Sequence, residues 1–123
     1  MNLNYFSLSE FDCPSLDGSG VNMDSQFLTK LESAREIAGI PFKITSGYRT
    51  KEYNEDLLKR GYKASKNSSH LIGVAADIAV SSGSERYIVL NALIKAGFKR
   101  IGVAKTFIHC DTDSSKPNSV WTY

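Results

Sequence analysis

The most informative segment of the chain is Ser69-His-Leu-Ile-Gly-Val-Ala-Ala-Asp77-Ile78, which places His70 and Asp77 at the mouth of a predicted buried strand. The second of the two histidines in the chain, His109, lies in another strand-like run, Phe107-Ile-His-Cys-Asp111. Two imidazoles and one carboxylate are the ligand set of a catalytic zinc site that keeps a fourth position for water. The pattern raises one zinc site as a hypothesis, beside the plainer interpretation that each residue is an ordinary polar group at a strand end.

The alternation of side chains along a strand makes this hypothesis geometrically specific. His109 and Asp111 should point to one face of their strand, and Cys110 to the other. Asp77 should share its face with small alanines, which leave room for a metal and a neighbouring strand. Gly73 lets the backbone turn between His70 and the strand that follows. If the two strands pair, His70, Asp77 and His109 converge.

Length and composition favour one globular domain over residues 1–123. The chain has 41% hydrophobic and 23% charged residues, which is ordinary for a soluble protein of this size. Its net charge of +2 is too small, and its basic residues too scattered, to indicate nucleic-acid binding. We expect a monomer. We also expect no membrane span, because no run approaches the roughly 20 apolar residues that a span needs.

The N-terminus lacks the basic and apolar regions of a signal peptide. We therefore expect synthesis in the cytoplasm, and action outside the membrane only after lysis, holin-type release or another export route. Cys13 and Cys110 are far apart in the sequence and form no disulfide framework. Two reduced, buried thiols are the main expectation, with a bridge or a metal-ligand role for Cys110 as alternatives.

Helical and strand-like segments alternate along the chain, which favours a compact α+β domain. The first helix should begin at Asp24 or Ser25 and end at Gly39, with Ile37 on its apolar face. The second should run from Thr50 to about residue 60, with Leu58 inward. Further elements are expected at the following ranges: a strand at 42–45, a strand at 74–80, a helix at 82–96, and a hairpin of 99–103 with 106–111. The N-terminal 23 residues should be irregular. The tail after residue 111 is polar except for Val120, Trp121 and the final tyrosine.

Several of these segments resemble one family when they are taken together. Residues 69–78 resemble the signature of the zinc D-alanyl-D-alanine carboxypeptidase and L-alanyl-D-glutamate peptidase family, whose metal-binding fold is shared with hedgehog signalling domains. Residues 44–50, followed by Tyr53-Asn54, resemble its Ser-Gly-Tyr-Arg segment, and residues 107–111 resemble the second histidine strand of short phage and bacterial members. The opening residues 6–11 are similar to the start of those members. The likeness covers most of the chain.

The resemblance implies a fold, a cofactor and roles for particular residues. The fold would be hedgehog/DD-peptidase-like, a small antiparallel sheet with flanking helices. His70, Asp77 and His109 would bind one Zn²⁺, which activates water and polarises the scissile carbonyl. Arg49 would grip a carboxylate of the substrate, or else form a structural ion pair. The implied partner is a stem peptide of peptidoglycan.

The general base is where the sequence departs from the best-known members of this family. Several relatives carry Glu or His two or three residues before the last zinc histidine, where this chain has Phe107 and Thr106. The short members carry an aspartate two residues after that histidine, and Asp111 matches it. Asp111 is therefore expected either as the catalytic base or as a residue that orients a zinc ligand.

Four further residues have two interpretations each. Ser69 is expected to contact substrate or to be a plain loop serine. Asp113 is a weaker base candidate, more readily explained as a solvated tail residue. Trp121 and the final tyrosine would pin the tail to the core rather than line a cleft.

The sequence leaves three possibilities open. The first is a zinc metallopeptidase, a D,D-carboxypeptidase or endolysin-like endopeptidase, that cuts peptidoglycan at a bond involving a D-amino acid. The alternative is a zinc-containing module that binds peptidoglycan or a protein and has weak or no catalysis. A domain without metal is the third and plainest possibility.

Overall fold

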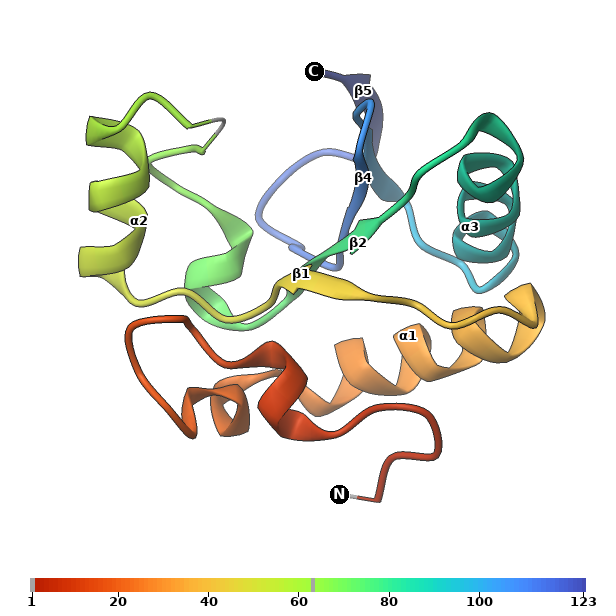
Figure 1. The fold of residues 1–123 in the computed structure, drawn as a ribbon, viewed down its shortest axis with the longest axis horizontal. Coiled ribbons are helices and arrows are strands. Elements are labelled where there is room, and N and C mark those ends of the chain that lie inside the picture. Colours follow the sequence, from red (N-terminus) through yellow and green to blue (C-terminus); the bar gives the residue numbers. More distant parts are fainter. Residues whose placement is uncertain (1, 63) are drawn as a thin grey trace.

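The structure is a computed structural model that describes residues 2–62 and 64–123. Helices and strands alternate along it as expected for an α+β fold (Figure 1). The α-helices are α1 (Ser25–Ala38), α2 (Lys51–Lys59) and α3 (Gly83–Lys95). The strands are β1 (Ile44–Ser46), β2 (Ala75–Ala79), β3 (Arg100–Val103), β4 (Phe107–Asp111) and β5 (Ser119–Thr122). Short 3-10 helices are η1 (Leu8–Phe11), η2 (Ser19–Asn22) and η3 (Ser69–Ile72).

The strands form one five-stranded sheet in the order β1-β2-β4-β3-β5. All neighbours are antiparallel except β3 and β5, which pair in parallel. The centre of the sheet is therefore the β2–β4 pair, the two strands on which the sequence places Asp77 and His109. The expected small antiparallel sheet with flanking helices is confirmed, with the parallel β5 as an addition.

One face of the sheet carries the hydrophobic core. Alternate residues of β2, β3 and β4 point to this face, where α1 and α3 pack against each other and the sheet. The sheet contributes these buried side chains: Ala76, Ile78, Ile101, Ile108 and Cys110. The helices contribute these: Phe27, Leu28, Leu31, Ala34, Val89, Ala92 and Leu93. The polar residues of the same strands are left for the opposite face.

The helix ends follow the capping signals in the sequence. Asp24 accepts a hydrogen bond from the backbone of Phe27 at the start of α1, and Gly39 closes that helix with a left-handed φ of 69°. The Thr50 side chain caps α2 in the same way. Ser82 caps α3, but the Glu85 side chain reaches back to Ser81 rather than to Ser82. The three helices therefore start where the sequence predicts.

Other expectations were wrong in detail. Ile37 and Leu58 are 44% and 37% exposed, because they lie toward solvent on helices that bury only one narrow stripe. The first strand begins at Ile44, not at residue 42. The region before residue 24, expected to be irregular, contains η1 and η2. The tail, for which no helix or strand was predicted, forms β5. The sequence of the tail does not predict this strand, because it lacks a strong apolar alternation. β5 forms by pairing with β3.

Two simpler expectations agree with the structure. Cys13 and Cys110 are both buried and unbridged. Burial raises the pKa of the Cys110 thiol well above its usual range. Among the described residues, none of the helices has the length and hydropathy of a membrane span.

Candidate metal centre

The second face of the sheet carries a row of residues that crosses its strands. In the strand register Ser46 of β1 lies opposite Asp77 of β2, and Asp77 lies opposite His109 of β4. The row continues through Gly102 of β3 to Trp121 of β5. Residues directly opposite one another point to the same face, so pairing places these side chains side by side.

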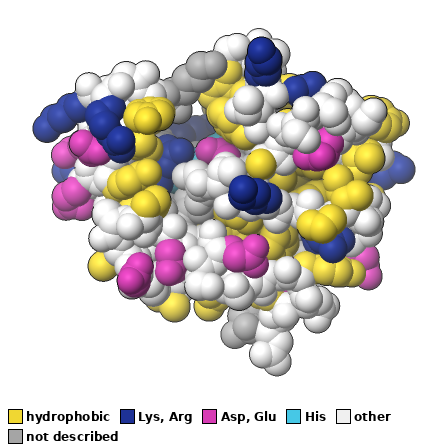
Figure 2. All heavy atoms as spheres, in the orientation of Figure 1, with side chains coloured by type: hydrophobic (Ala, Val, Ile, Leu, Met, Phe, Trp, Pro, Cys, Tyr) yellow, Lys and Arg dark blue, Asp and Glu magenta, His cyan; other side chains and the backbone are white. Residues whose placement is uncertain are grey.

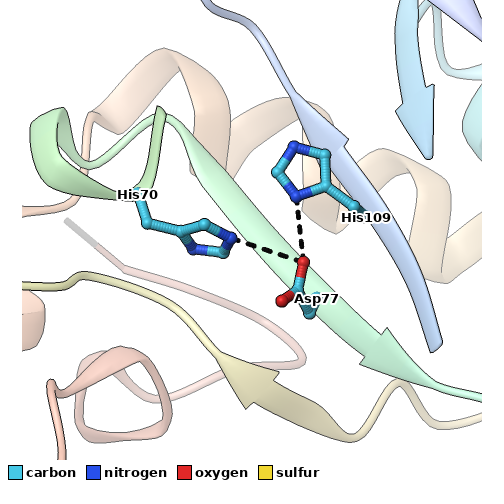
Figure 3. A group of neighbouring side chains, drawn as sticks. All are labelled: His70, Asp77 and His109. Carbon is cyan, nitrogen blue, oxygen red and sulfur yellow. Dashed lines mark hydrogen bonds and ion pairs between the residues drawn. The ribbon is translucent and has the colours of Figure 1, made fainter. Parts of the chain in front are cut away.

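His70 joins this row from η3, which precedes β2. Figure 3 shows His70, Asp77 and His109 converging from η3, β2 and β4. Asp77 Oδ1 lies 2.9 Å from His109 Nδ1 and 3.4 Å from His70 Nε2. The potential ligand atoms of all three residues lie within 4.8 Å of one another, and all three residues are buried. The sequence-predicted ligand set is therefore brought together.

The turn between His70 and Asp77 depends on Gly73. This glycine ends η3 with a φ of 73°, in the left-handed region. A Cβ atom here would lie 2.3 Å from the carbonyl oxygen of Asn22. The backbone N–H of Asp24 donates to the Gly73 carbonyl, which ties the turn to the start of α1. Glycine is therefore required at position 73 for two reasons: the φ is left-handed, and the backbone of Asn22 leaves no space for a Cβ atom.

A hydrogen bond at Nδ1 of His70 fixes the orientation of its imidazole. His70 Nδ1 lies 2.7 Å from the carbonyl oxygen of Gly47, which can only accept a hydrogen bond. Nδ1 must therefore carry the proton, and the Nε2 lone pair faces Asp77. A metal-binding histidine is commonly held by such a backbone carbonyl.

The donor set and its spacing fit zinc. Two nitrogens and one carboxylate oxygen are ligands that Zn²⁺ accepts, at distances that separate neighbouring ligand atoms by about 3.3 Å in a tetrahedral shell. The two nitrogen-to-Asp77 distances, 2.9 and 3.4 Å, are close to that separation. Three protein ligands would leave one position for water or substrate.

The charges around Asp77 favour a cation at this point. Burial alone would raise the pKa of Asp77, but His70 and His109 outweigh it and hold that pKa well below its usual range. Burial lowers the pKa of His70 and keeps its ring neutral. For His109, hydrogen bonds to Asp111 and Asp77 overcome burial and raise the pKa. A ring held between two carboxylates stabilises positive charge here.

Asp111 lies on the side of the His109 ring away from Asp77. Its Oδ2 is 2.7 Å from His109 Nε2, and its Oδ1 is 2.8 Å from Arg100 Nε. The backbone N–H of Asp113 also donates to Asp111, which is 1% exposed. Burial would raise the pKa of Asp111, but its bonds to His109, Asp113 and Arg100 lower it. The same-face relation of His109 and Asp111 follows the predicted strand parity.

Arg49 is close to the predicted ligands and is itself buried. Its Nη2 lies 3.5 Å from Asp77, and its Nε and Nη1 donate to Ser46 and to the buried Asn54. Burial lowers the pKa of Arg49, although Asp77 opposes that effect. The two hydrogen bonds use two of the five guanidinium N–H groups, and together with the ion pair to Asp77 they fix the plane of the head group.

Ser69 belongs to a small network that links η3 to the segment after β4. Its hydroxyl donates to Asp113 at 2.7 Å and accepts from Lys116 at 2.9 Å. Asp113 is 6% exposed, so its description as a solvated tail residue was wrong. Burial would raise the Asp113 pKa, but hydrogen bonds from Ser115 and Ser69 lower it to about 2. No local pattern could reveal this contact, because its partners are 44 residues apart.

His70 and three residues of the row, Asp77, His109 and Trp121, line an open cleft of about 450 Å³. Figure 2 shows the surface hollowed between the α2 side of the molecule and the C-terminal strands, with acidic and basic side chains beside the hollow. Phe107, Trp121 and Tyr123 line the cleft, as do the hydroxyls of Ser65, Ser68 and Ser69. The prediction that Trp121 and Tyr123 would only pin the tail therefore missed their place in the cleft wall.

Comparisons with known proteins agree with this geometry. The sequence profile of the family described as Peptidase M15 matches residues 4–111. The fold is similar to the crystal structure of Serratia marcescens L-Ala D-Glu endopeptidase ChiX, with a TM-score of 0.55 and 17% sequence identity. That match covers 62% of this chain and 62% of that chain. No match to the sequence was found among curated proteins.

Proposed function

The chain belongs to the peptidase M15 family, and we propose that it is a zinc peptidase that cleaves peptidoglycan stem peptides at a bond involving a D-amino acid. One observation carries the proposal. Two imidazole nitrogens and a carboxylate oxygen converge at the floor of an open cleft, in a chain whose family consists of peptidases. The L-Ala D-Glu endopeptidase with the similar fold makes that bond the first candidate.

In this proposal His70, Asp77 and His109 hold one zinc ion. Zinc bound there would supply Lewis-acid activation of a water molecule and of the scissile carbonyl. His70 contributes Nε2, because its Nδ1 is committed to the Gly47 carbonyl. His109 contributes Nδ1, because its Nε2 faces Asp111.

We assign Arg49 to substrate binding. Its hydrogen bonds to Ser46 and Asn54 and its ion pair with Asp77 leave guanidinium N–H groups for substrate, and the residue lines the cleft. A guanidinium fixed in this way can bind a carboxylate or carbonyl oxygen of the peptide without losing further conformational entropy. The same fixed geometry makes Lys a poor replacement.

The contacts of Asp111 support a positioning role rather than the role of base. Its two oxygens are occupied by His109 Nε2 and by Arg100 Nε. Because Nε2 and Nδ1 diverge from the imidazole ring, Asp111 lies away from the position that the ligand set surrounds. Asp111 would then hold the tautomer and direction of His109, as carboxylates commonly do behind metal-binding histidines.

Ser69 was predicted to contact substrate, and its position in the cleft wall keeps that role as a proposal. Its hydroxyl is already bonded to Asp113 and Lys116, so it also holds the η3 turn in place.

The deciding experiment is digestion of purified muropeptides by the zinc-loaded protein, with the products identified by mass spectrometry. We expect cleaved stem peptides, and the masses will distinguish release of terminal D-alanine from cleavage within the stem. His109→Ala is the matched control and should give no product. Intact muropeptides from pH 5 to 9, with zinc confirmed bound, would refute the proposal.

A second candidate is a zinc-containing binding module with weak or no catalysis. One observation favours it. Among the described residues that line the cleft, the carboxylates are Asp77, which is bonded to His109, and Asp111, which is bonded to His109 and Arg100. Neither carboxylate is left to act as a general base. Calorimetric titration with muropeptides would distinguish this candidate, which predicts binding without turnover.

We further propose that residues 1–123 act as one monomeric domain on the cell wall, reached after lysis, holin-type release or another export route. The described helices and sheet share one core, which supports the single domain. Light scattering during size-exclusion chromatography tests the monomer.

A further inference from the structure

We propose that Trp121 is a positioning residue for His109, and that β5 is therefore part of the metal centre although it supplies no ligand. This inference rests on the proposed zinc site. Its basis is a closed ring of contacts among four residues of β3, β4 and β5.

The closed set of contacts begins and ends at His109. His109 Nε2 lies 2.7 Å from Asp111 Oδ2, and Asp111 Oδ1 lies 2.8 Å from Arg100 Nε. The Arg100 guanidinium lies over the Trp121 ring, 4.8 Å from its centroid. The Trp121 ring in turn contacts the His109 ring, with centroids 5.4 Å apart.

The ring of contacts restrains His109 in two directions. Asp111 fixes Nε2 of the imidazole by a hydrogen bond. Once Nδ1 is given to a metal rather than hydrogen-bonded to Asp77, that single remaining hydrogen bond leaves rotation about its own axis. Trp121 blocks that rotation by packing against the imidazole at an angle of 48°. Arg100 couples the two restraints, because the same side chain holds Asp111 and stacks on Trp121. His109 Nδ1 is thereby kept facing Asp77.

Gly102 is the residue that admits Trp121 to this position. It lies between His109 and Trp121 in the row that crosses the sheet. A Cβ atom at Gly102 would lie 2.5 Å from Trp121 Nε1 and 2.6 Å from Cε2. Any side chain at 102 would therefore push the indole off the sheet, although the backbone of Gly102 has no unusual φ.

The test compares Trp121→Ala, Trp121→Phe, Gly102→Ala and the double variant Gly102→Ala/Trp121→Ala with the unmodified protein. Val120→Ala is the control, because Val120 is on the same strand, 65% exposed and outside the cleft. Zinc affinity is measured by competition with a chromophoric chelator. Nitrogen-15 NMR of the imidazoles reports the tautomer of His109, and only two histidines need assignment. Thermal melting confirms that each variant is folded.

We expect Trp121→Ala to weaken zinc binding by about 10- to 100-fold, the range found for residues that orient metal ligands. Trp121→Phe should recover most of that loss, and Val120→Ala should bind as the unmodified protein does. Gly102→Ala should weaken binding alone but add little in the Trp121→Ala background, because the indole that it displaces is already absent.

Unchanged zinc affinity and an unchanged His109 signal in a folded Trp121→Ala variant would overturn this inference. Full additivity of Gly102→Ala and Trp121→Ala would also overturn it. A protein that binds zinc through His70 and His109 but cuts no muropeptide would refute the proposed peptidase, and the positioning role would still be measurable.

Discussion

At the scale of single residues, His109 is held between two carboxylates that have different roles. Asp77 faces the nitrogen directed toward His70, and Asp111 faces the nitrogen directed away from it. The two carboxylates of the site can therefore be separated by experiment, since only one of them would be a ligand.

Asp111→Asn should lower zinc affinity about tenfold or more, because an amide holds the imidazole less strongly than a carboxylate does. If Asp111 only positions His109, saturating zinc should restore most of the turnover of the variant. The measurement is kcat on muropeptides as a function of free zinc. Loss of turnover that persists at saturating zinc would instead identify Asp111 as the base.

Asp113 should contribute to stability at neutral pH and lose that contribution in acid. Its pKa is lowered to about 2 in the folded chain from 3.8, so its carboxylate stabilises the fold above about pH 4. The contribution, at most about 2 kcal/mol, should disappear as the pH falls from 4 toward 2.

Asp113→Asn isolates this effect from those of Asp77 and Asp111. Urea unfolding should show a less stable variant at pH 7 and a shrinking difference from the unmodified protein below pH 4. A difference that stays constant down to pH 2 would contradict the assignment. Ser114→Ala, at an exposed neighbouring position, is the control.

At the scale of elements, the η3 turn holds His70 by contacts to three other parts of the chain. Its Gly73 packs against the backbone of Asn22, the His70 ring bonds to Gly47, and Ser69 bonds to Asp113. A turn of four residues has little stability of its own, so these contacts determine where His70 lies.

Gly73→Ala should destabilise the fold by at least about 2 kcal/mol, because its φ is left-handed and its new Cβ would clash with the Asn22 carbonyl. That clash is with backbone, so moving a side chain cannot relieve it. Gly39→Ala provides the comparison: its φ is also positive, at 69°, but no atom lies within 4 Å of a Cβ there. Its cost should be only about 1 to 2 kcal/mol. Equal losses for the two variants in urea unfolding would show that the close approach to Asn22 is unimportant.

At the scale of the whole molecule, the sheet separates the core from the candidate metal centre. The apolar cluster lies with α1 and α3 on one face, and the row from Ser46 to Trp121 lies on the other. The fold should therefore not require metal, in contrast to small domains whose core is the metal site.

Removal of zinc by a chelator should leave the far-ultraviolet circular dichroism spectrum unchanged and lower the melting temperature. Free zinc at about 100 times its Kd should add about 2.7 kcal/mol of stability through binding to the folded state alone. His70→Ala should be folded but should show no zinc-dependent shift. Loss of the helical signal on chelation would contradict this separation of core and site.

Local sequence patterns were sufficient to predict where the helices start and which residues converge at the candidate site. Asp24, Thr50 and Ser82 cap their helices through bonds to residues only three positions away, so local patterns were sufficient. Strand parity likewise predicted that His109 and Asp111 share a face. The spacing of His70, Asp77 and His109, read together with the family resemblance, identified residues that the fold brings within 4.8 Å of one another.

How those residues are held depends on contacts that form only in the folded chain. The position of β5, the burial of Asp113 and the place of Trp121 in the cleft wall depend on partners far away in the chain. Gly102 showed no turn signal because its role is to leave space for another strand's indole. Local propensity cannot encode such contacts, because their free energy exists only once the sheet has assembled. The convergence of the candidate ligands was therefore predictable from the sequence, and their orientation was not.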